Sequence, residues 1–180
     1  MISDLLFYEL LLLGLLWLYI VLHGAWPSGS RLVGPGSDPG GIQWGTAYDG
    51  TQIYVAIGHT TGQAYTLPSG ATITGGSFAA LDPSNGRVIW QTPDPQGAPD
   101  QGALTVANGV LYGASIARTG DQMFALDTTT GAILWRFASG GSVVDGPAVV
   151  NGTVYWGSGY ARAPGGIGNT LFYVFSIDGT

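Results

Sequence analysis

The stretch "ALDPSNGRVIW" (Ala80–Trp90) returns almost unchanged as "ALDTTTGAILW" (Ala125–Trp135), 45 residues later. In each copy an aspartate follows a short apolar run, and a glycine stands four residues after the aspartate. Aspartate side chains accept backbone N–H bonds in turns, and glycine adopts positive φ at no steric cost. We therefore predict that both copies form two strands joined by the same turn. The closing tryptophan of each copy is predicted to be buried against the neighbouring repeat.

A second pattern alternates with the first along the chain. Three segments place an Asp-Gly or Asn-Gly pair between two runs of alternating apolar residues, which is the strongest short-range signal for a β-hairpin. These segments are "AYDGTQIYVAIG" from Ala47, "TVANGVLYGAS" from Thr105 and "AVVNGTVYWGSG" from Ala148. Four short strands in about 45 residues, without helical periodicity, are typical of a β-propeller blade.

The predicted fold is all-β, a partial β-propeller of about three four-stranded blades over residues 31–180. The third repeat begins at Asp145, and its hairpin is followed by a further strand in "NTLFYVFSID". The sequence ends where the fourth strand of that blade would begin. Because a propeller with too few blades leaves sheet faces and edges unburied, we expect that this chain does not close a propeller by itself.

The composition agrees with many short strands and excludes several kinds of function. Glycine accounts for 31 of the 180 residues, and only 9% of residues are charged. The five basic residues are all arginines spread along the chain, so no basic surface for nucleic acid is predicted. The chain has no cysteine, which rules out disulfides, thiolate metal sites, cysteine nucleophiles and a covalently attached c-type haem within it.

Residues 1–30 form a separate hydrophobic segment. From Leu5 to Leu22 it carries a single charge, Glu9, and its length borders on that of a membrane-spanning helix. Three interpretations stay open: a membrane anchor through residues 5–22, a cleaved export signal, or a mistranslated leader. The start lacks the basic residues of a signal peptide. The first arginine follows the segment, which by the positive-inside tendency favours a cytoplasmic location for the rest of the chain.

The "ALD…G…W" units, together with "GPAVVNGTVYWGSG", resemble the repeats of the pyrroloquinoline quinone (PQQ) quinoprotein superfamily. The runs "GGIQWGTAYDGTQIYVAIG" from Gly40 and "VDGPAVVNGTVYWGSGYAR" are similar to its polyvinyl-alcohol dehydrogenase branch. The resemblance covers about residues 31–180 and implies the C-terminal blades of an eight-bladed propeller.

This resemblance implies a periplasmic or extracellular enzyme, or a fragment of one, that oxidises an alcohol by hydride transfer to PQQ. Electrons would pass to a cytochrome c on a separate protein, and calcium commonly accompanies the quinone in the family. An alternative is a non-catalytic scaffold of the outer-membrane assembly type, because the superfamily includes such proteins on the same fold. A further alternative is an inactive truncated gene product. We expect the chain not to be active by itself, since other blades would carry most of the cofactor ligands.

The predicted site lies at one mouth of the central channel. If the strands that follow Gly45, Gly102 and Gly146 are innermost, the residues just before these glycines face the same mouth. They are Gln43 and Trp44, Asp100 and Gln101, and Val144 and Asp145.

Three of these residues are candidates for binding PQQ. An indole ring stacks on a planar quinone and amides donate to its oxygens, so the predicted cofactor-binding residues are Gln43, Trp44 and Gln101. Related quinoproteins carry "GG…NW" at the cofactor, and Gln43 stands in place of that asparagine. Packing against the protein is the alternative role for Trp44.

Alcohol oxidation also needs a base near the hydroxyl group, and a carboxylate is the usual choice. Asp145 and Asp100 are the acids at the predicted mouth, so both are predicted to be catalytic. The alternative for Asp145 is a structural role in its turn. The long loop from Gln91 to Gly102 is predicted either to carry substrate specificity or to be a solvated connector.

No metal site is predicted. His23 and His59 have no partners at the spacing of metal ligands, and "DPSNG" at Asp82 lacks the downstream acidic residue of a calcium loop.

Overall fold

The computed structural model describes residues 29–36, 38, 40–162 and 165–176, and its regular secondary structure there consists of β-strands. From Arg31 on, the chain forms one compact unit, Arg31–Thr180. The strands are β1 (Ala47–Tyr48), β2 (Ile53–Ile57), β3 (Tyr65–Thr66), β4 (Thr72–Ile73), β5 (Ser77–Leu81), β6 (Val88–Pro93), β7 (Thr105–Ala107), β8 (Val110–Ala114), β9 (Met123–Asp127), β10 (Ile133–Phe137), β11 (Ala148–Val150), β12 (Thr153–Gly157) and β13 (Phe172–Phe175). This part of the chain contains no helix with the length and apolar character of a membrane span. The anchor predicted at residues 5–22 lies outside the described residues.

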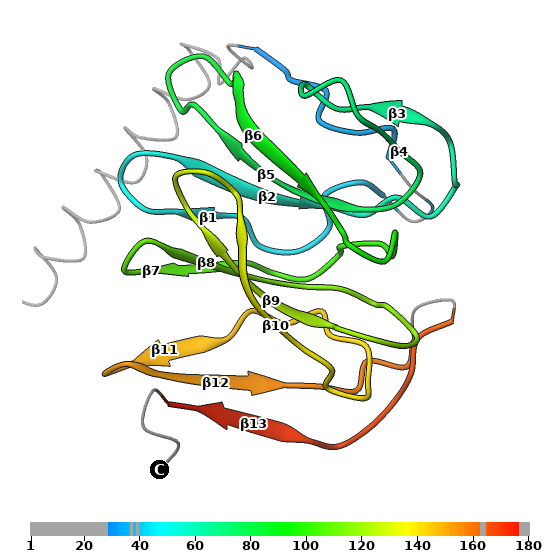
Figure 1. Cartoon of the computed structure of the whole chain (residues 1–180), viewed down its shortest axis with the longest axis vertical. Helices are drawn as coiled ribbons and strands as arrows, with labels where there is room; N and C mark the ends of the chain where they lie inside the picture. Colours follow the sequence, from blue (N-terminus) through cyan, green and yellow to red (C-terminus); the bar gives the residue numbers. More distant parts are fainter. Residues whose placement is uncertain (1–28, 37, 39, 163–164, 177–180) are drawn as a thin grey trace, which may run out of the picture. The chain divides into compact units, whose positions relative to one another are not determined.

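Three antiparallel sheets follow one another along the chain (Figure 1). Blade 1 has the order β1-β2-β5-β6, blade 2 consists of β7-β8-β9-β10, and blade 3 consists of β11-β12-β13. Each sheet is a meander of sequential strands, as in a propeller blade. The predicted all-β fold, a partial propeller of about three blades, is confirmed. A small hairpin, β3–β4, is inserted between β2 and β5. The sequence does not predict it, because two-residue strands are too short to show alternation.

The hairpin turns have the conformation that the Asn-Gly pairs predict. Asn108 and Gly109 have φ of 51° and 77°, and Asn151 and Gly152 have φ of 50° and 79°. Positive φ at both central residues is the type I′ arrangement, whose twist matches that of the two strands it joins. These turns therefore fix the register of β7 with β8 and of β11 with β12.

The repeated "ALD…G…W" units also turn as predicted. Asp127 Oδ1 accepts the backbone N–H of Thr130 at 2.7 Å, and Gly131 follows with φ of 72°. In the first copy Asp82 Oδ1 accepts the N–H of Ser84, and Gly86 has φ of 70°. The same turn thus joins β5 to β6 and β9 to β10.

The first strands of the three sheets, β1, β7 and β11, lie next to one another. The N–H of Leu104 donates to the carbonyl of Gly45 at 3.0 Å, and the N–H of Ala103 donates to that of Val144 at 2.9 Å. Successive blades are therefore tied together along the edge formed by their first strands, which is the inner edge expected in a propeller.

Two apolar cores lie between the blades. Trp90 is 9% exposed in the first core, and its Nε1 donates to the carbonyl of Thr128 in blade 2 at 2.8 Å. The predicted burial of Trp90 against the next repeat is confirmed. The core between blades 1 and 2 contains Tyr54, Ala56, Phe78, Ala80, Trp90, Leu104, Leu111, Phe124 and Leu126. The core between blades 2 and 3 contains Ala114, Met123, Val143 and Trp156.

Trp135 contacts the neighbouring blade as predicted, but its predicted burial is wrong, because this side chain is 37% exposed. Its ring stacks on Phe137 and meets Phe175 edge-on, with centroids 4.9 Å apart. The turn of blade 3 that would correspond to the turn holding Trp90 falls in residues 177–180, outside the described part of the chain.

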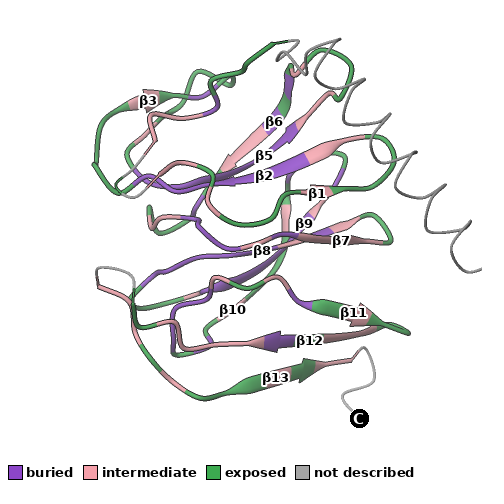
Figure 2. Ribbon diagram, turned by 180° about the vertical axis from the view of Figure 1, so that it is seen from behind, coloured by how far each residue is buried: buried purple, intermediate pink, exposed green. Residues whose placement is uncertain are grey.

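The outward-facing sheet surfaces of blades 1 and 3 differ in how far other residues cover them. On blade 1, Val33 from the preceding segment packs against Val55 and Ile57, and its carbonyl accepts a 2.8 Å bond from Gln91 Nε2. Blade 3 has no such cover among the described residues, and its outermost strand, β13, alternates between exposed and half-buried residues (Figure 2). This agrees with the expectation that sheet surface stays unburied. Exposed apolar side chains on blade 3 are Val150, Tyr155, Phe172 and Val174.

Candidate functional site

The residues predicted to face one mouth come together at one end of the inner strands. The bonds from Leu104 to Gly45 and from Ala103 to Val144 align the three segments that lead into β1, β7 and β11. The Asn-Gly turns of β7–β8 and β11–β12 lie at the other end of these strands. These three segments therefore share one end of the inner strands, but their side chains lie in very different surroundings.

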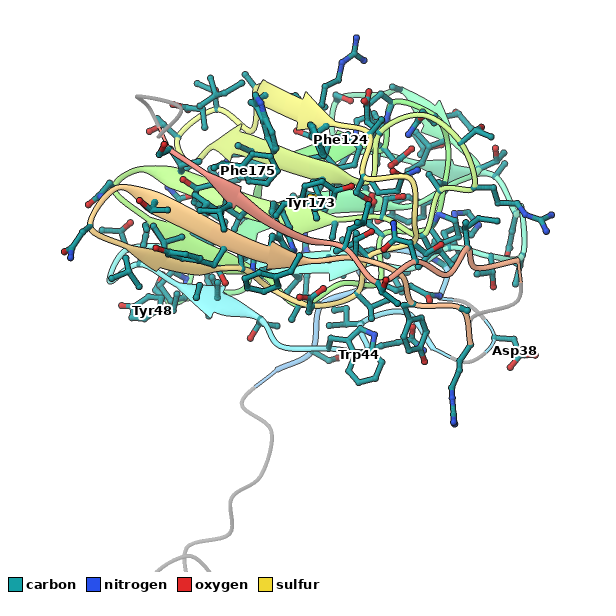
Figure 3. All side chains as sticks on the ribbon, turned by 90° about the horizontal axis from the view of Figure 1, so that it is seen from below. Asp38, Trp44, Tyr48, Phe124, Tyr173 and Phe175 are labelled. Atoms are coloured by element: carbon teal, nitrogen blue, oxygen red, sulfur yellow. The ribbon has the colours of Figure 1, made fainter. Side chains whose placement is uncertain are left out.

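Trp44 is 48% exposed and lies at the surface (Figure 3). Tyr160 approaches it with ring centroids 6.5 Å apart and an interplanar angle of 78°. Gln43, the preceding residue, is half-buried. No motif in the sequence marks Tyr160. It follows β12, which runs antiparallel to β11 and so returns the chain to the mouth, and this topology is the signal that could have identified it.

Asp145 is exposed at the surface and also takes part in hydrogen bonds within the fold. Its Oδ2 accepts the N–H of Gly157 at 3.2 Å, and its backbone carbonyl accepts Trp156 Nε1 at 2.9 Å. Partial burial raises the pKa of Asp145, although hydrogen bonds from its own N–H and from Gly157 oppose the shift. The carboxylate thus caps the end of β12 and holds a proton more tightly than an ordinary surface aspartate.

Asp100 is fully buried, in contrast to Asp145. Among the described residues, neither of its carboxyl oxygens has a hydrogen-bond donor. Burial raises the pKa of Asp100 well above its ordinary value, and the neighbouring carboxylate of Asp94 raises it further. Asp94 Oδ1 accepts the N–H groups of Gln96 at 2.7 Å and Ala98 at 3.0 Å, which favour its ionised form. Burial also raises the pKa of Asp94, although these hydrogen bonds oppose the shift, so the tendency to hold a proton is stronger at Asp100.

The loop from Gln91 to Gly102 is firmly attached to the blades. Gln96 Nε2 donates to the carbonyl of Asp121 at 2.7 Å, and Gln96 Oε1 accepts the N–H of the same residue at 2.9 Å. A Cβ on Gly76 would collide with the backbone of Asp100, so the glycine lets the loop pass close over β5. The interpretation of this loop as a purely solvated connector is therefore wrong.

A pocket of about 650 Å³ lies beside this loop. Gln101, one of the predicted cofactor-binding residues, lines it together with His59, whose side chain is 2% exposed. His59 has no partner among its neighbours along the chain and so no role predicted from sequence, whereas the fold brings the loops after β2, β6 and β8 together. In the described residues no three histidine, cysteine, aspartate or glutamate side chains are grouped so as to hold a metal ion.

A model of a PQQ-repeat family, described as outer membrane protein assembly factor BamB, matches residues 74–174, which is more than half of the chain. The chain belongs to this PQQ-repeat family. The matched region begins ahead of β5 and extends into β13, so it includes both copies of the "ALD…G…W" unit. The resemblance read from the sequence is confirmed.

The PQQ-repeat chain is similar to two curated polyvinylalcohol dehydrogenases. It is 31% identical to that of Sphingopyxis sp. (strain 113P3) over 183 residues and 30% identical to that of Pseudomonas sp. over 184 residues. In each case the match covers 83% of this chain and 27% of the relative, so the chain spans about a quarter of their length. Quinohemoprotein alcohol dehydrogenase from Comamonas testosteroni superposes with a TM-score of 0.46 and 20% identity, over 66% of this chain and 17% of that one.

The PQQ-type blades thus separate the five predicted site residues. At this end of the inner strands Trp44 and Asp145 are exposed and Gln43 is half-buried, and Gln101 lines the pocket. Asp100 lies inside the protein with Asp94. Their roles in cofactor binding and catalysis remain predictions.

Proposed function

We propose that these blades form part of a PQQ-dependent alcohol dehydrogenase that passes electrons to a cytochrome c. The observation that supports this most directly is the similarity to polyvinylalcohol dehydrogenases over 83% of the chain. We infer an alcohol as substrate and a periplasmic or extracellular location from the same likeness.

The chemistry of the predicted cofactor-binding side chains suits a planar, polar quinone. Trp44 offers a half-exposed indole surface for stacking, and the amides of Gln43 and Gln101 offer donors for quinone oxygens. Arg118 lines the pocket beside Gln101 and offers a positive charge for a carboxylate. We assign no ligands to a calcium ion.

When bound, the quinone supplies the hydride acceptor for alcohol oxidation. We propose that Asp145 is the base that accepts the hydroxyl proton. Its surface position makes it reachable by a substrate, and its raised pKa increases its affinity for the proton. Asp100 is the weaker candidate, because its side chain is fully buried and closed off from solvent.

The test is a titration of the protein with PQQ, in which the tryptophan fluorescence of the protein is measured at each concentration of PQQ. We expect saturable quenching in the wild type and its loss in Trp44→Ala. Trp135→Ala is the matched control, because Trp135 is similarly exposed but lines a separate groove with residues of the Asn-Gly turns at the other end of the blades. Equal quenching in the wild type and in Trp44→Ala would remove Trp44 from the cofactor site.

A second candidate function is a non-catalytic scaffold. The description of the matching family, an outer membrane protein assembly factor, favours it. Under this proposal PQQ does not bind, and the exposed mouth and blade surfaces contact other proteins. Specific recovery of membrane-assembly partners by the wild type, together with an absence of saturable PQQ quenching, would favour the scaffold over the dehydrogenase.

A further inference from the structure

We propose that Tyr160 is a positioning residue for Trp44, whose indole it holds in place with one face free to stack on a planar ligand. The two residues come from blades that are not consecutive, because Trp44 leads into β1 of blade 1 and Tyr160 follows β12 of blade 3. The inference rests on the proposed function, since the planar ligand is the quinone assigned there to Trp44. It adds a residue from another blade to that site.

The contact between the two rings is edge-on. Their centroids lie 6.5 Å apart, and the ring planes make an angle of 78°. The charge distribution of aromatic rings favours this arrangement, in which one ring directs its edge at the other. An edge-on neighbour covers at most one face of the indole, and Trp44 keeps 48% of its surface exposed. At least one face of the indole is therefore not covered by Tyr160.

The backbone at Tyr160 is firmly attached to the segment that leads into blade 3. The N–H groups of Gly159 and Tyr160 both donate to the carbonyl of Ser142, at 3.0 and 2.8 Å. Ser142 is fully buried, and its hydroxyl donates to the carbonyl of Ile116 at 3.3 Å. A Cβ on Gly159 would collide with the backbone of Asn169, so the glycine lets two stretches of the loop between β12 and β13 lie close together. Tyr160 therefore projects from well-anchored backbone.

An anchored Tyr160 lowers the cost of binding a ligand to Trp44. A half-exposed side chain loses rotational freedom when a ligand stacks on it, and this loss costs free energy. The contact with Tyr160 restricts the indole before the ligand arrives, so less freedom is left to lose. An aromatic pair of this kind is expected to strengthen binding about two- to tenfold.

The first test needs no quinone. The full chain is labelled with 5-fluorotryptophan, and the ¹⁹F NMR signal of Trp44 is identified by its absence in Trp44→Phe. We expect Tyr160→Ala to shift this signal toward that of free 5-fluorotryptophan, and Tyr160→Phe to preserve it, because phenylalanine keeps the ring. Tyr155→Ala, which removes a surface tyrosine from β12 of the same blade, is the matched control and should leave the signal unchanged. An unchanged Trp44 signal in Tyr160→Ala would overturn the proposal.

The second test measures the affinity for PQQ by quenching of tryptophan fluorescence in the unlabelled protein. We expect the dissociation constant to rise about two- to tenfold in Tyr160→Ala and to stay at the wild-type value in Tyr160→Phe and Tyr155→Ala. Tyr160→Leu replaces Tyr160→Ala in both tests if the alanine variant does not fold. Equal affinity of the wild type and Tyr160→Ala would overturn the role of Tyr160 and leave the proposed function standing. Absence of saturable quenching in the wild type would overturn both.

Discussion

The indole Nε1 of Trp90 donates a 2.8 Å hydrogen bond to the backbone carbonyl of Thr128, joining the last strand of blade 1 to the turn of blade 2. The same indole lies against Gly131 in that turn. Trp90 and Thr128 belong to the two copies of the repeated "ALD…G…W" unit. The tryptophan that ends one copy therefore docks on the turn of the next copy, and the repeat encodes the contact between blades as well as the strands within them.

Replacement of Trp90 by phenylalanine is expected to destabilise the protein. The change keeps an aromatic ring in the core but leaves the buried carbonyl of Thr128 without its donor, which costs about 1–3 kcal/mol. Urea unfolding followed by circular dichroism measures the difference. Trp135→Phe is the control, because the described structure gives Trp135 no hydrogen bond of this kind. Equal losses in the two variants would contradict the importance of the bond to Thr128.

Gly131→Ala is expected to lower the stability of the fold much more than Gly152→Ala. Both glycines have positive φ, 72° and 79°, so both variants incur a similar backbone penalty of about 1 kcal/mol. A Cβ at Gly131 would also collide with the ring of Trp90, whereas a Cβ at Gly152 meets no atom within 4 Å. Thermal unfolding of the two variants isolates the packing between blades, and a similar melting temperature for both would show that the indole can shift without cost.

The buried Asp100 is expected to make the folded state less stable as pH rises. Its pKa is raised in the folded state, so its contribution to stability is complete below the ordinary value of 3.8 and is lost as pH rises through the folded-state pKa. Asp100→Asn keeps the size and polarity of the side chain and removes this titration. The free energy of unfolding of the variant should therefore fall less steeply with pH above 3.8 than that of the wild type.

The pKa of Asp127 is shifted in the opposite direction, so Asp127 serves as a comparison for the pH dependence of stability. Hydrogen bonds from the Thr130 side chain and from backbone N–H groups lower the pKa of Asp127, so its stabilising contribution is present above 3.8 and is lost as pH falls. Asp127→Asn should flatten the acidic side of the stability profile. If Asp100→Asn changed the acidic side in the same way, the assignment of a raised pKa to the buried Asp100 would be wrong.

The paired bonds between Gln96 and Asp121 are expected to hold the long loop in place. Gln96→Ala removes both, so the amide of Asp121 should lose protection in hydrogen exchange by about tenfold, as for bonds worth roughly 1.4 kcal/mol. The amide of Leu111, in the central strand β8, serves as an internal reference. Unchanged exchange at Asp121 would mean that Asp94 alone fixes the loop.

Much of the fold could be predicted because its signals are local. The Asn-Gly turns at Asn108 and Asn151 and the glycine at Gly131 need particular backbone angles that few other residues adopt, so the sequence marks them directly. The β3–β4 hairpin escaped prediction because its strands have only two residues each. The burial of Trp135 was predicted wrongly, because burial at this position depends on a neighbouring turn rather than on the motif that contains the tryptophan.

Less of the candidate site than of the fold could be predicted from the sequence. Equivalent positions in the repeat predicted that Trp44, Gln101 and Asp145 would lie at one mouth, and the aligned inner strands agree with this arrangement. The same equivalence could not reveal that Asp100 is buried beside Asp94, because burial depends on how the loop folds back over β5. The exposure of a side chain is a property of the packing around it and not of its place in a repeat.

The sequence by itself determined the blades of this protein, since turn chemistry and alternating apolar residues act within a few residues of one another. Only the tertiary structure decided which polar groups face solvent, which are buried in pairs, and that His59 and Gln101 share a pocket. Those outcomes depend on contacts between loops of successive blades that are far apart along the chain, and no local pattern specifies the space left between them.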